Sequence, residues 1–302
     1  MEKKNKSTEQ SRLRAFLTGD RFKALLPLIG FVIIILVMHI MTNGKILTPK
    51  KLRLLFSQIY YPTIVATGVF FIMTLGSIDF TEGSTLGVAS IVVSALSFYS
   101  IPLAILGGIL TGAAIGALNG FFHVKFRLPS FIVTICTMYL FRGVCAYFTT
   151  ETAVPASNAI KALDQDWLKI TITLTVLAVA FFLFKFTRIG NDVKAVGSGE
   201  TAARFSGVRT GRVKFLAFVG AGALTGLAAF VNVIKVGSIT STAGNQLETQ
   251  ILISLVLGGL PITGGAKVRF TNIIVGTLMP NIASENIRAK PIINVSIAVF
   301  LI

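Results

Sequence analysis

Two carboxylates, Asp79 and Glu82, stand between apolar runs with almost no loop around them. Ionisable groups at membrane depth are costly and indicate a functional site by default, so this pair predicts a gate or a transport pathway. The pair can equally serve the fold, because negative charge suits the positive end of the helix that follows. Asn119 and Asn232 can supply amides to a polar cavity or form hydrogen bonds between helices, and the sequence leaves both alternatives open.

Arg142 is the one basic residue inside the apolar run 130–149. A charged group in such a segment needs a partner. We expect Arg142 to form a structural ion pair with a carboxylate, or hydrogen bonds to carbonyl groups, rather than to contact a substrate.

The cysteines and histidines predict neither a disulfide nor a metal site. Cys136 and Cys145 are nine residues apart, which places them on opposite faces of a helix. His39 and His123 are isolated. We also find no nucleophile–base pair, so a membrane enzyme is the least supported class.

Composition places the chain in a membrane. Hydrophobic residues make up 53% and charged residues 13% of the sequence, with a mean hydropathy of +0.79, whereas soluble domains carry roughly 25% charged residues. The net charge of +16 does not indicate nucleic-acid binding, because the basic residues gather in loops between apolar runs. The expected partner of this surface is the lipid bilayer.

The apolar runs predict an all-α polytopic protein of about ten transmembrane helices, since a span needs about 20 apolar residues. The expected organisation is a basic cytoplasmic N-terminus at 1–24 followed by a single transmembrane domain at 25–302. Gly/Pro-rich Leu257–Gly265 predicts that some helices are broken or re-entrant. The expected spans are 25–42, 60–78, 83–99, 101–122, 130–149, 167–186, 214–235, 246–262, 270–283 and 291–302.

Charge in the loops predicts the orientation. Most Lys and Arg residues fall in segments that lie on one side if the N-terminus is cytoplasmic, and 187–214 is the longest such loop between spans. The acidic segment 150–166 then lies outside. The basic segment 43–57 is an exception that would also lie outside.

Glycines repeat every four residues in two predicted helices. Gly108, Gly112, Gly116 and Gly120 form one ridge, and Gly222 and Gly226 repeat the spacing. Small ridges let membrane helices approach closely. We expect packing within one protomer, with a dimer seam as the alternative.

A short helix is predicted inside the polar loop Thr187–Lys214. Ser198 can cap it, Glu200 suits its first turn and can pair with Arg204, and Gly207 can end it in a left-handed conformation. About two turns of helix are not stable in water alone. The helix is therefore either a docking element for another protein or an ordinary interfacial helix.

Three stretches together resemble the permeases of bacterial ribose-type ABC importers. The first is Ser77–Gly87 (SIDFTEGSTLG), the second is Gly116–Arg142, and the third is Thr187–Lys214. Matching positions include Asp79, Gly83 and Ser84 in the first, Asn119, Gly120, Leu128, Pro129 and Thr134 in the second, and Ala195, Gly197, Ala202, Ala203, Arg204, Ser206 and Gly207 in the third.

The resemblance implies a type II importer-like permease in the bacterial inner (plasma) membrane. It implies that the loop is a coupling element, with Gly197, Glu200, Ala202, Ala203, Arg204, Ser206 and Gly207 as its residues. The partners implied are a cytoplasmic ABC ATPase, an extracytoplasmic solute-binding protein and a second permease protomer, identical or different. Because the chain has no GxxxxGK[ST] loop, ATP and Mg²⁺ belong on the ATPase, and this chain has no cofactor or catalytic residue of its own.

The solute implied is a monosaccharide such as ribose or another pentose or hexose. Alternatives within the same superfamily are a nucleoside, an autoinducer or a branched-chain amino acid. An ion-coupled secondary transporter is the alternative from another class. It would need carboxylates in paired broken helices, to which only Asp79 and Glu82 come close.

Overall fold

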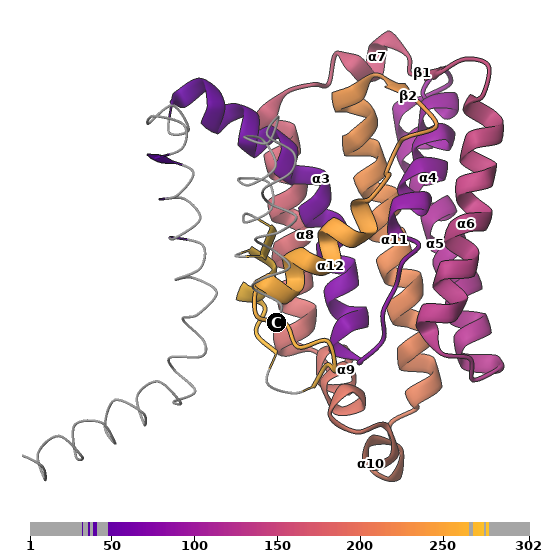
Figure 1. Cartoon of the computed structure of the whole chain (residues 1–302), viewed down its shortest axis with the longest axis vertical. Helices are drawn as coiled ribbons and strands as arrows, with labels where there is room; N and C mark the ends of the chain where they lie inside the picture. The colour runs from indigo at the N-terminus through magenta and orange to yellow at the C-terminus, as the bar shows by residue number, and fades with distance from the viewer. Residues whose placement is uncertain are drawn as a thin grey trace, which may run out of the picture.

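The computed structural model describes residues 48–265, 268–274 and 276–277, together with Val32, Leu36, His39 and Ile40. Most of these residues are helical, which confirms the all-α fold class (Figure 1). One two-residue antiparallel ribbon joins Val154–Pro155 (β1) to Ser238–Ile239 (β2). The helices are α3 Pro49–Thr74, α4 Glu82–Leu96, α5 Ile101–Lys125, α6 Ser130–Thr149, α7 Asn158–Lys161, α8 Asp166–Phe186, α9 Arg188–Ser198, α10 Glu200–Phe205, α11 Thr210–Val236 and α12 Leu247–Leu257.

Five helices in the described part of the chain are long and apolar enough to cross a membrane. They are α3 (from Phe56), α5, α6, α8 and α11. Helices α4 and α12 are apolar but have only 15 and 11 residues, fewer than the roughly 20 that a span needs. The structure therefore does not confirm about ten spans. The expected span 291–302, half of 270–283, and all of 25–42 except Val32, Leu36, His39 and Ile40 lie outside the described residues.

Helix α3 begins earlier than the sequence predicts. Its first residue is Pro49, a residue suited to the first helical position because its ring presets φ and it has no N–H to satisfy. Much of the basic segment 43–57 is therefore helix rather than loop. Arg53 pairs with Asp166 at the start of α8, with 2.7 Å between Nε and Oδ2.

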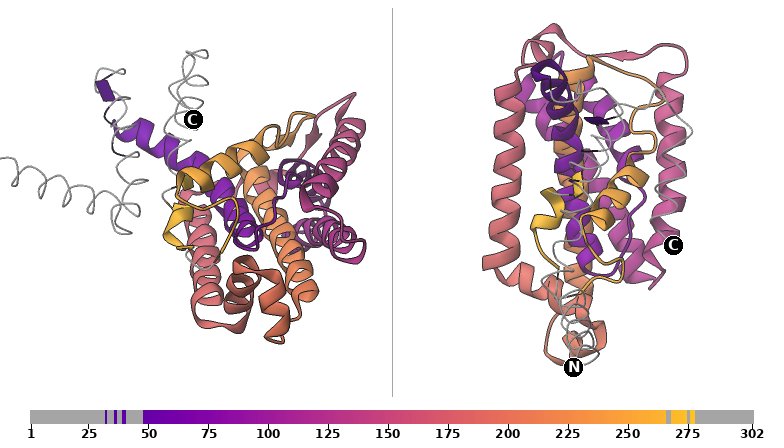
Figure 2. Two further views of the ribbon diagram at one scale, coloured as in Figure 1. Left: turned by 60° about the horizontal axis from the view of Figure 1, so that its bottom comes forward. Right: turned by 60° about the vertical axis from the view of Figure 1, so that its left-hand side comes forward.

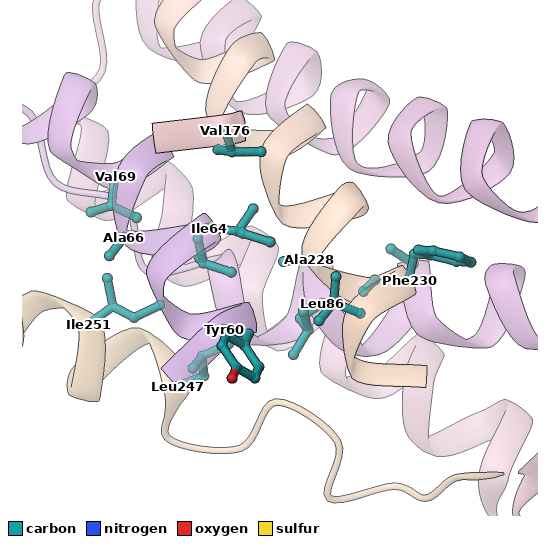
Figure 3. Packing of buried hydrophobic residues seen from close by; sticks show 14 of the residues in the cluster. Tyr60, Ile64, Ala66, Val69, Leu86, Val176, Ala228, Phe230, Leu247 and Ile251 are labelled. Atoms are coloured by element: carbon teal, nitrogen blue, oxygen red, sulfur yellow. The ribbon is translucent and has the colours of Figure 1, made fainter. Parts of the chain in front are cut away.

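The apolar core gathers around α3, which lies among the other long helices (Figures 1 and 2). Figure 3 shows side chains of α3, α4, α8, α11 and α12 meeting there. They include Ile64 and Val69 of α3, Leu86 of α4, Val176 of α8, Ala228 of α11 and Ile251 of α12.

The glycine ridges of α5 and α11 pack against each other. A Cβ on Gly112 would overlap the carbonyl oxygen of Gly222, and one on Gly226 would overlap that of Gly108. The backbones thus touch where side chains would otherwise stand, as small residues allow in membranes. This confirms packing within one protomer.

The two polar connections of opposite charge lie at opposite ends of the bundle. The segment 150–165 forms β1 and α7 at one end, and α9 and α10 lie at the other (Figure 1). The break predicted after α12 is also present. Gly264 and Gly265 have φ of +71° and +123°, and the Gly265 N–H donates to the Thr74 carbonyl at 3.1 Å, so the end of α3 satisfies part of the freed backbone.

Candidate functional site

The connection between α3 and α4 carries polar groups into the interior. Helix α3 ends at Thr74, Gly76 turns the chain with φ of +75°, and α4 begins only at Glu82. Figure 1 shows the connection running back from the α9 end into the bundle. Asp79 and Glu82 are almost completely buried. The N-terminus of α4 therefore lies inside the protein.

A chain of hydrogen bonds joins Asp79 to two neighbouring helices. The Thr81 N–H and Oγ1 both donate to Asp79 Oδ1, at 2.7 and 2.5 Å. Asn119 Nδ2 of α5 donates to Thr81 Oγ1 at 2.9 Å, and Thr137 Oγ1 of α6 donates to Asn119 Oδ1 at 2.7 Å. The sequence analysis missed Thr137, because a single hydroxyl in an apolar run is the only feature that distinguishes it.

Glu82 faces a different helix. Its Oε2 accepts a hydrogen bond from Thr225 Oγ1 of α11, whereas its buried Oε1 has no partner among the described residues. Glu82 is also the first residue of α4, where its charge suits the dipole. Both sequence interpretations of Asp79 and Glu82 thus remain compatible with the geometry.

Arg142 forms the ion pair that its position predicts. Its Nη2 lies 2.8 Å from Glu248 Oε1 and 3.4 Å from the Gly244 carbonyl oxygen. A Cβ on Gly83 would overlap Glu248 Oε2, so this carboxylate packs against the first turn of α4. Sequence reasoning missed Glu248, although it is the one carboxylate in the expected span 246–262.

Asn232 lies apart from this cluster. Its Nδ2 is 3.4 Å from Ser90 Oγ of α4. Asn232 is seven residues from Thr225 along α11, which is about 10 Å of helix. The structure thus brings Asp79, Glu82 and Asn119 together and gives Asn232 a hydrogen bond between helices.

The polar loop forms two helices rather than one. Ser198 ends α9, and its Oγ donates to the Lys194 carbonyl at 2.8 Å, so it does not cap α10; Gly199 occupies the cap position. The Ser198 cap was a wrong prediction, because the residues before it already form a helix, and the Lys194 carbonyl of that helix accepts the hydrogen bond from the Ser198 hydroxyl. Gly207 does turn the chain, with φ of +86°.

Glu200 pairs with Lys214 instead of Arg204. The Lys214 Nζ lies 2.6 Å from Glu200 Oε2, because the turn at Gly207 brings the start of α11 back beside α10. The hydrogen bond from Lys214 lowers the pKa of Glu200 below its usual range. This pair fastens α10 to α11 at the end of the bundle.

Helix α10 has an inner and an outer side. Ala203 is buried and packs in one cluster with Leu75, Val193 and Val196. Ala202, Arg204 and Ser206 are exposed, and the Phe205 side chain is 88% exposed. Ala203, one of the coupling residues that the resemblance implies, therefore faces the bundle and not a partner. Phe205 is the large apolar group presented outward, and sequence reasoning missed it.

The loop is packed directly onto the end of α3. A Cβ on Gly197 would overlap the Thr74 carbonyl oxygen, and Ala203 shares its cluster with Leu75. Asp79 lies only four residues after Leu75. A displacement of α9 and α10 would thus act on the connection that carries Asp79 and Glu82.

Comparison with known proteins decides what kind of molecule has this arrangement. The family described as the permease component of the branched-chain amino acid transport system matches residues 52–302. The chain belongs to this permease family. No solved structure was found to match the permease.

Several known permeases are similar to this one. The ribose import permease protein of Escherichia coli (strain K12) is 29% identical over 228 residues, covering 72% of this chain and 71% of that protein. The L-arabinose ABC transporter permease protein of Azospirillum brasilense is 30% identical over 262 residues, covering 83% and 77%. The autoinducer 2 import system permease protein of Enterobacter sp. (strain 638) is 30% identical over 253 residues, covering 81% and 71%.

Proposed function

We propose that this permease is the membrane subunit of an ABC importer for a monosaccharide, with ribose and arabinose as the first solutes to test. Similar permeases are named for ribose and L-arabinose import. Autoinducer 2 is the second candidate solute, because one permease at 30% identity is named for its import.

The observation that carries the proposal is the contact between α10 and the end of α3. The cluster of Ala203 with Leu75, Val193 and Val196 joins the exposed loop to the buried polar connection. An ATPase subunit that moves α10 would act on Asp79 and Glu82 through this cluster. The proposal places α9 and α10 in the cytoplasm, a solute-binding protein at the opposite end, and a second permease protomer alongside.

Phe205 is the residue that we assign to the ATPase contact. Large aromatic side chains that fill a pocket dominate the binding energy of protein interfaces. Phe205 stands 88% exposed beyond the membrane-spanning helices, whereas its neighbour Ala203 faces inward. Glu200, Arg204 and Ser206 would form the polar surroundings of this contact, and the small Ala202 would lie beside them.

Transport in proteoliposomes tests the function. The permease, the ATPase and the binding protein encoded beside it would be reconstituted with ATP inside, where the ATPase can reach it, and uptake of labelled ribose, arabinose and autoinducer 2 measured. We expect ATP-dependent uptake that an inactive ATPase abolishes. Uptake driven by a proton or sodium gradient without ATP would instead establish an ion-coupled secondary transporter.

The same preparation tests Phe205. Phe205→Ala should weaken ATPase binding by about 30-fold, the effect of losing roughly 2 kcal/mol at an interface hot spot, without lowering the melting temperature. Phe98→Ala is the matched control, because Phe98 is 62% exposed and lies at the opposite end of the bundle. Equal ATPase affinity in both variants would remove Phe205 from the coupling contact.

A further inference from the structure

A long groove opens between α8 and α11, with α3 as its floor. Its volume is about 1040 Å³, and its lining is largely apolar. Along α11 it extends from Arg212 to Leu224, and along α8 from Thr175 to Leu183. The twelve helical steps from Arg212 to Leu224 measure about 18 Å, close to the roughly 15 Å of one leaflet's hydrocarbon.

The groove faces away from the packed core. Val179 of α8 and Leu216 of α11 both line it and are 53% and 61% exposed. In membrane-spanning helices, such surface contacts lipid. At Gly220 an added Cβ would meet no atom within 4 Å, so open space lies directly above the backbone of α11.

The mouth of the groove is basic. Arg188, Arg209 and Arg212 line the end that adjoins α9 and α10, where Asp192 is the one lining acidic residue described. No ion pair joins any of the three arginines to another residue in the described part of the chain. The N-terminus of α9 lies at Arg188 and adds the positive end of its dipole there.

We propose that this groove binds one anionic phospholipid from the leaflet next to α9 and α10. An acyl chain would lie along the apolar lining between α8 and α11. The phosphate and the anionic headgroup would bind Arg188, Arg209 and Arg212, which can donate paired hydrogen bonds to phosphate oxygens. Basic pockets between membrane helices are known to recognise such headgroups.

The charge pattern favours a lipid over a protein segment. An apolar helix of a second copy would cover the upper groove but leave three arginines without anions, whereas a phospholipid supplies both the apolar chain and the charge. The leaflet is cytoplasmic if the proposed function is correct, but lipid binding itself does not depend on that assignment.

Lipid binding to the full-length permease in a mild detergent tests the proposal. Native mass spectrometry would compare phosphatidylglycerol with phosphatidylcholine of the same acyl chains. We expect phosphatidylglycerol to bind on the order of 20-fold more tightly, since each basic residue near the headgroup contributes about fivefold and Asp192 offsets one of three. The preference should shrink as ionic strength rises.

Two variants separate the headgroup from the acyl chain. Combined substitution R188Q/R209Q/R212Q should abolish the preference for phosphatidylglycerol, whereas Arg127→Gln, an exposed arginine outside the groove, should keep it. Gly220→Leu should fill the groove and weaken both lipids. Gly143→Leu is its control, because an added Cβ there also meets no atom within 4 Å but lies on α6.

Three results would overturn the proposal. One is an unchanged lipid preference in the triple variant. Another is loss of dimer without loss of lipid in Gly220→Leu, which would assign the groove to a second copy. The third is lipid binding and a dimer that Gly220→Leu both leaves unchanged, which would place the bound lipid on another surface of the permease. None of these measurements requires transport, so the lipid proposal can be tested even if the proposed transport function is wrong.

Discussion

At the scale of single residues, the interior of the permease contains polar side chains that form hydrogen bonds or ion pairs with one another. Asp79 accepts two hydrogen bonds from Thr81, and Arg142 pairs with Glu248. Burial makes an unpartnered charge expensive, whereas a partnered one is tolerated. The loss of stability caused by a substitution here therefore depends on which buried polar or charged group it leaves without a partner.

Asp79→Asn tests whether the charge at this position serves transport. The amide oxygen of Asn can accept the same two hydrogen bonds from Thr81, so the network should persist and stability should change by only about 0.3–1 kcal/mol. If Asp79 belongs to the pathway, uptake per folded molecule should fall clearly. Melting temperature and uptake would be measured on one preparation. Normal uptake would show that the role of Asp79 is purely structural.

The pair of Arg142 and Glu248 tests the cost of a lone charge. Arg142→Gln leaves Glu248 buried without its cation and should destabilise the permease by about 3 kcal/mol. Adding Glu248→Gln should recover much of this loss, because the uncompensated charge is then gone. Denaturation of both single variants and the double variant gives the coupling energy, and simple additivity would contradict a functioning ion pair.

At the scale of elements, helix contact in this protein depends on backbone approach rather than on large side chains. Helices α5 and α11 touch through Gly108, Gly112, Gly222 and Gly226. Helix α10 is likewise fastened by a small residue, Ala203, and by the Glu200–Lys214 pair. Added volume should therefore be more harmful at these points than lost volume.

Gly112→Ala measures that sensitivity. The new methyl group would overlap the Gly222 carbonyl, so α5 and α11 must separate, at a cost of about 1–3 kcal/mol. Gly143→Ala, which meets open space, should be neutral or stabilising by up to about 1 kcal/mol through helix propensity. Equal melting temperatures of the two variants would show that the ridge contact is not tight.

At the scale of the whole molecule, the charged connections lie at two opposite ends, and the proposed function puts α9 and α10 in the cytoplasm. Most basic loop residues favour this orientation. The groove between α8 and α11 then faces the cytoplasmic leaflet, and the ribbon of β1 and β2 faces outward.

Cysteine labelling in intact cells tests the orientation. Ser198→Cys and Asn158→Cys, both at exposed positions, would be made in a background without Cys136 and Cys145. Asn158 is preferred to its neighbour Ser157, which is buried and accepts a hydrogen bond from the Ile160 N–H. An impermeant thiol reagent should label position 158 only. Labelling of position 198 but not 158 would show that the permease has the opposite orientation in the membrane.

The sequence by itself determined the class of the molecule, because composition and the length of apolar runs report directly on the bilayer. It also determined local features. The glycine spacing predicted a close ridge, Gly207 predicted a left-handed turn, and Arg142 predicted an ion pair or hydrogen bonds to carbonyl groups inside an apolar helix. Each of these depends on one residue type or on a short repeat, which is why it can be recognised without coordinates.

Only the tertiary structure decided which distant residues meet. No local sequence pattern predicts that Arg142 pairs with Glu248, Glu82 with Thr225, or Glu200 with Lys214. Each pair depends on how the helices pack. The same reason explains the wrong prediction at Ser198, since a hydroxyl donates to whichever carbonyl lies near, and the inward position of Ala203, since a small residue can face either way. Helix propensity identifies a short helix, but only packing selects its buried side.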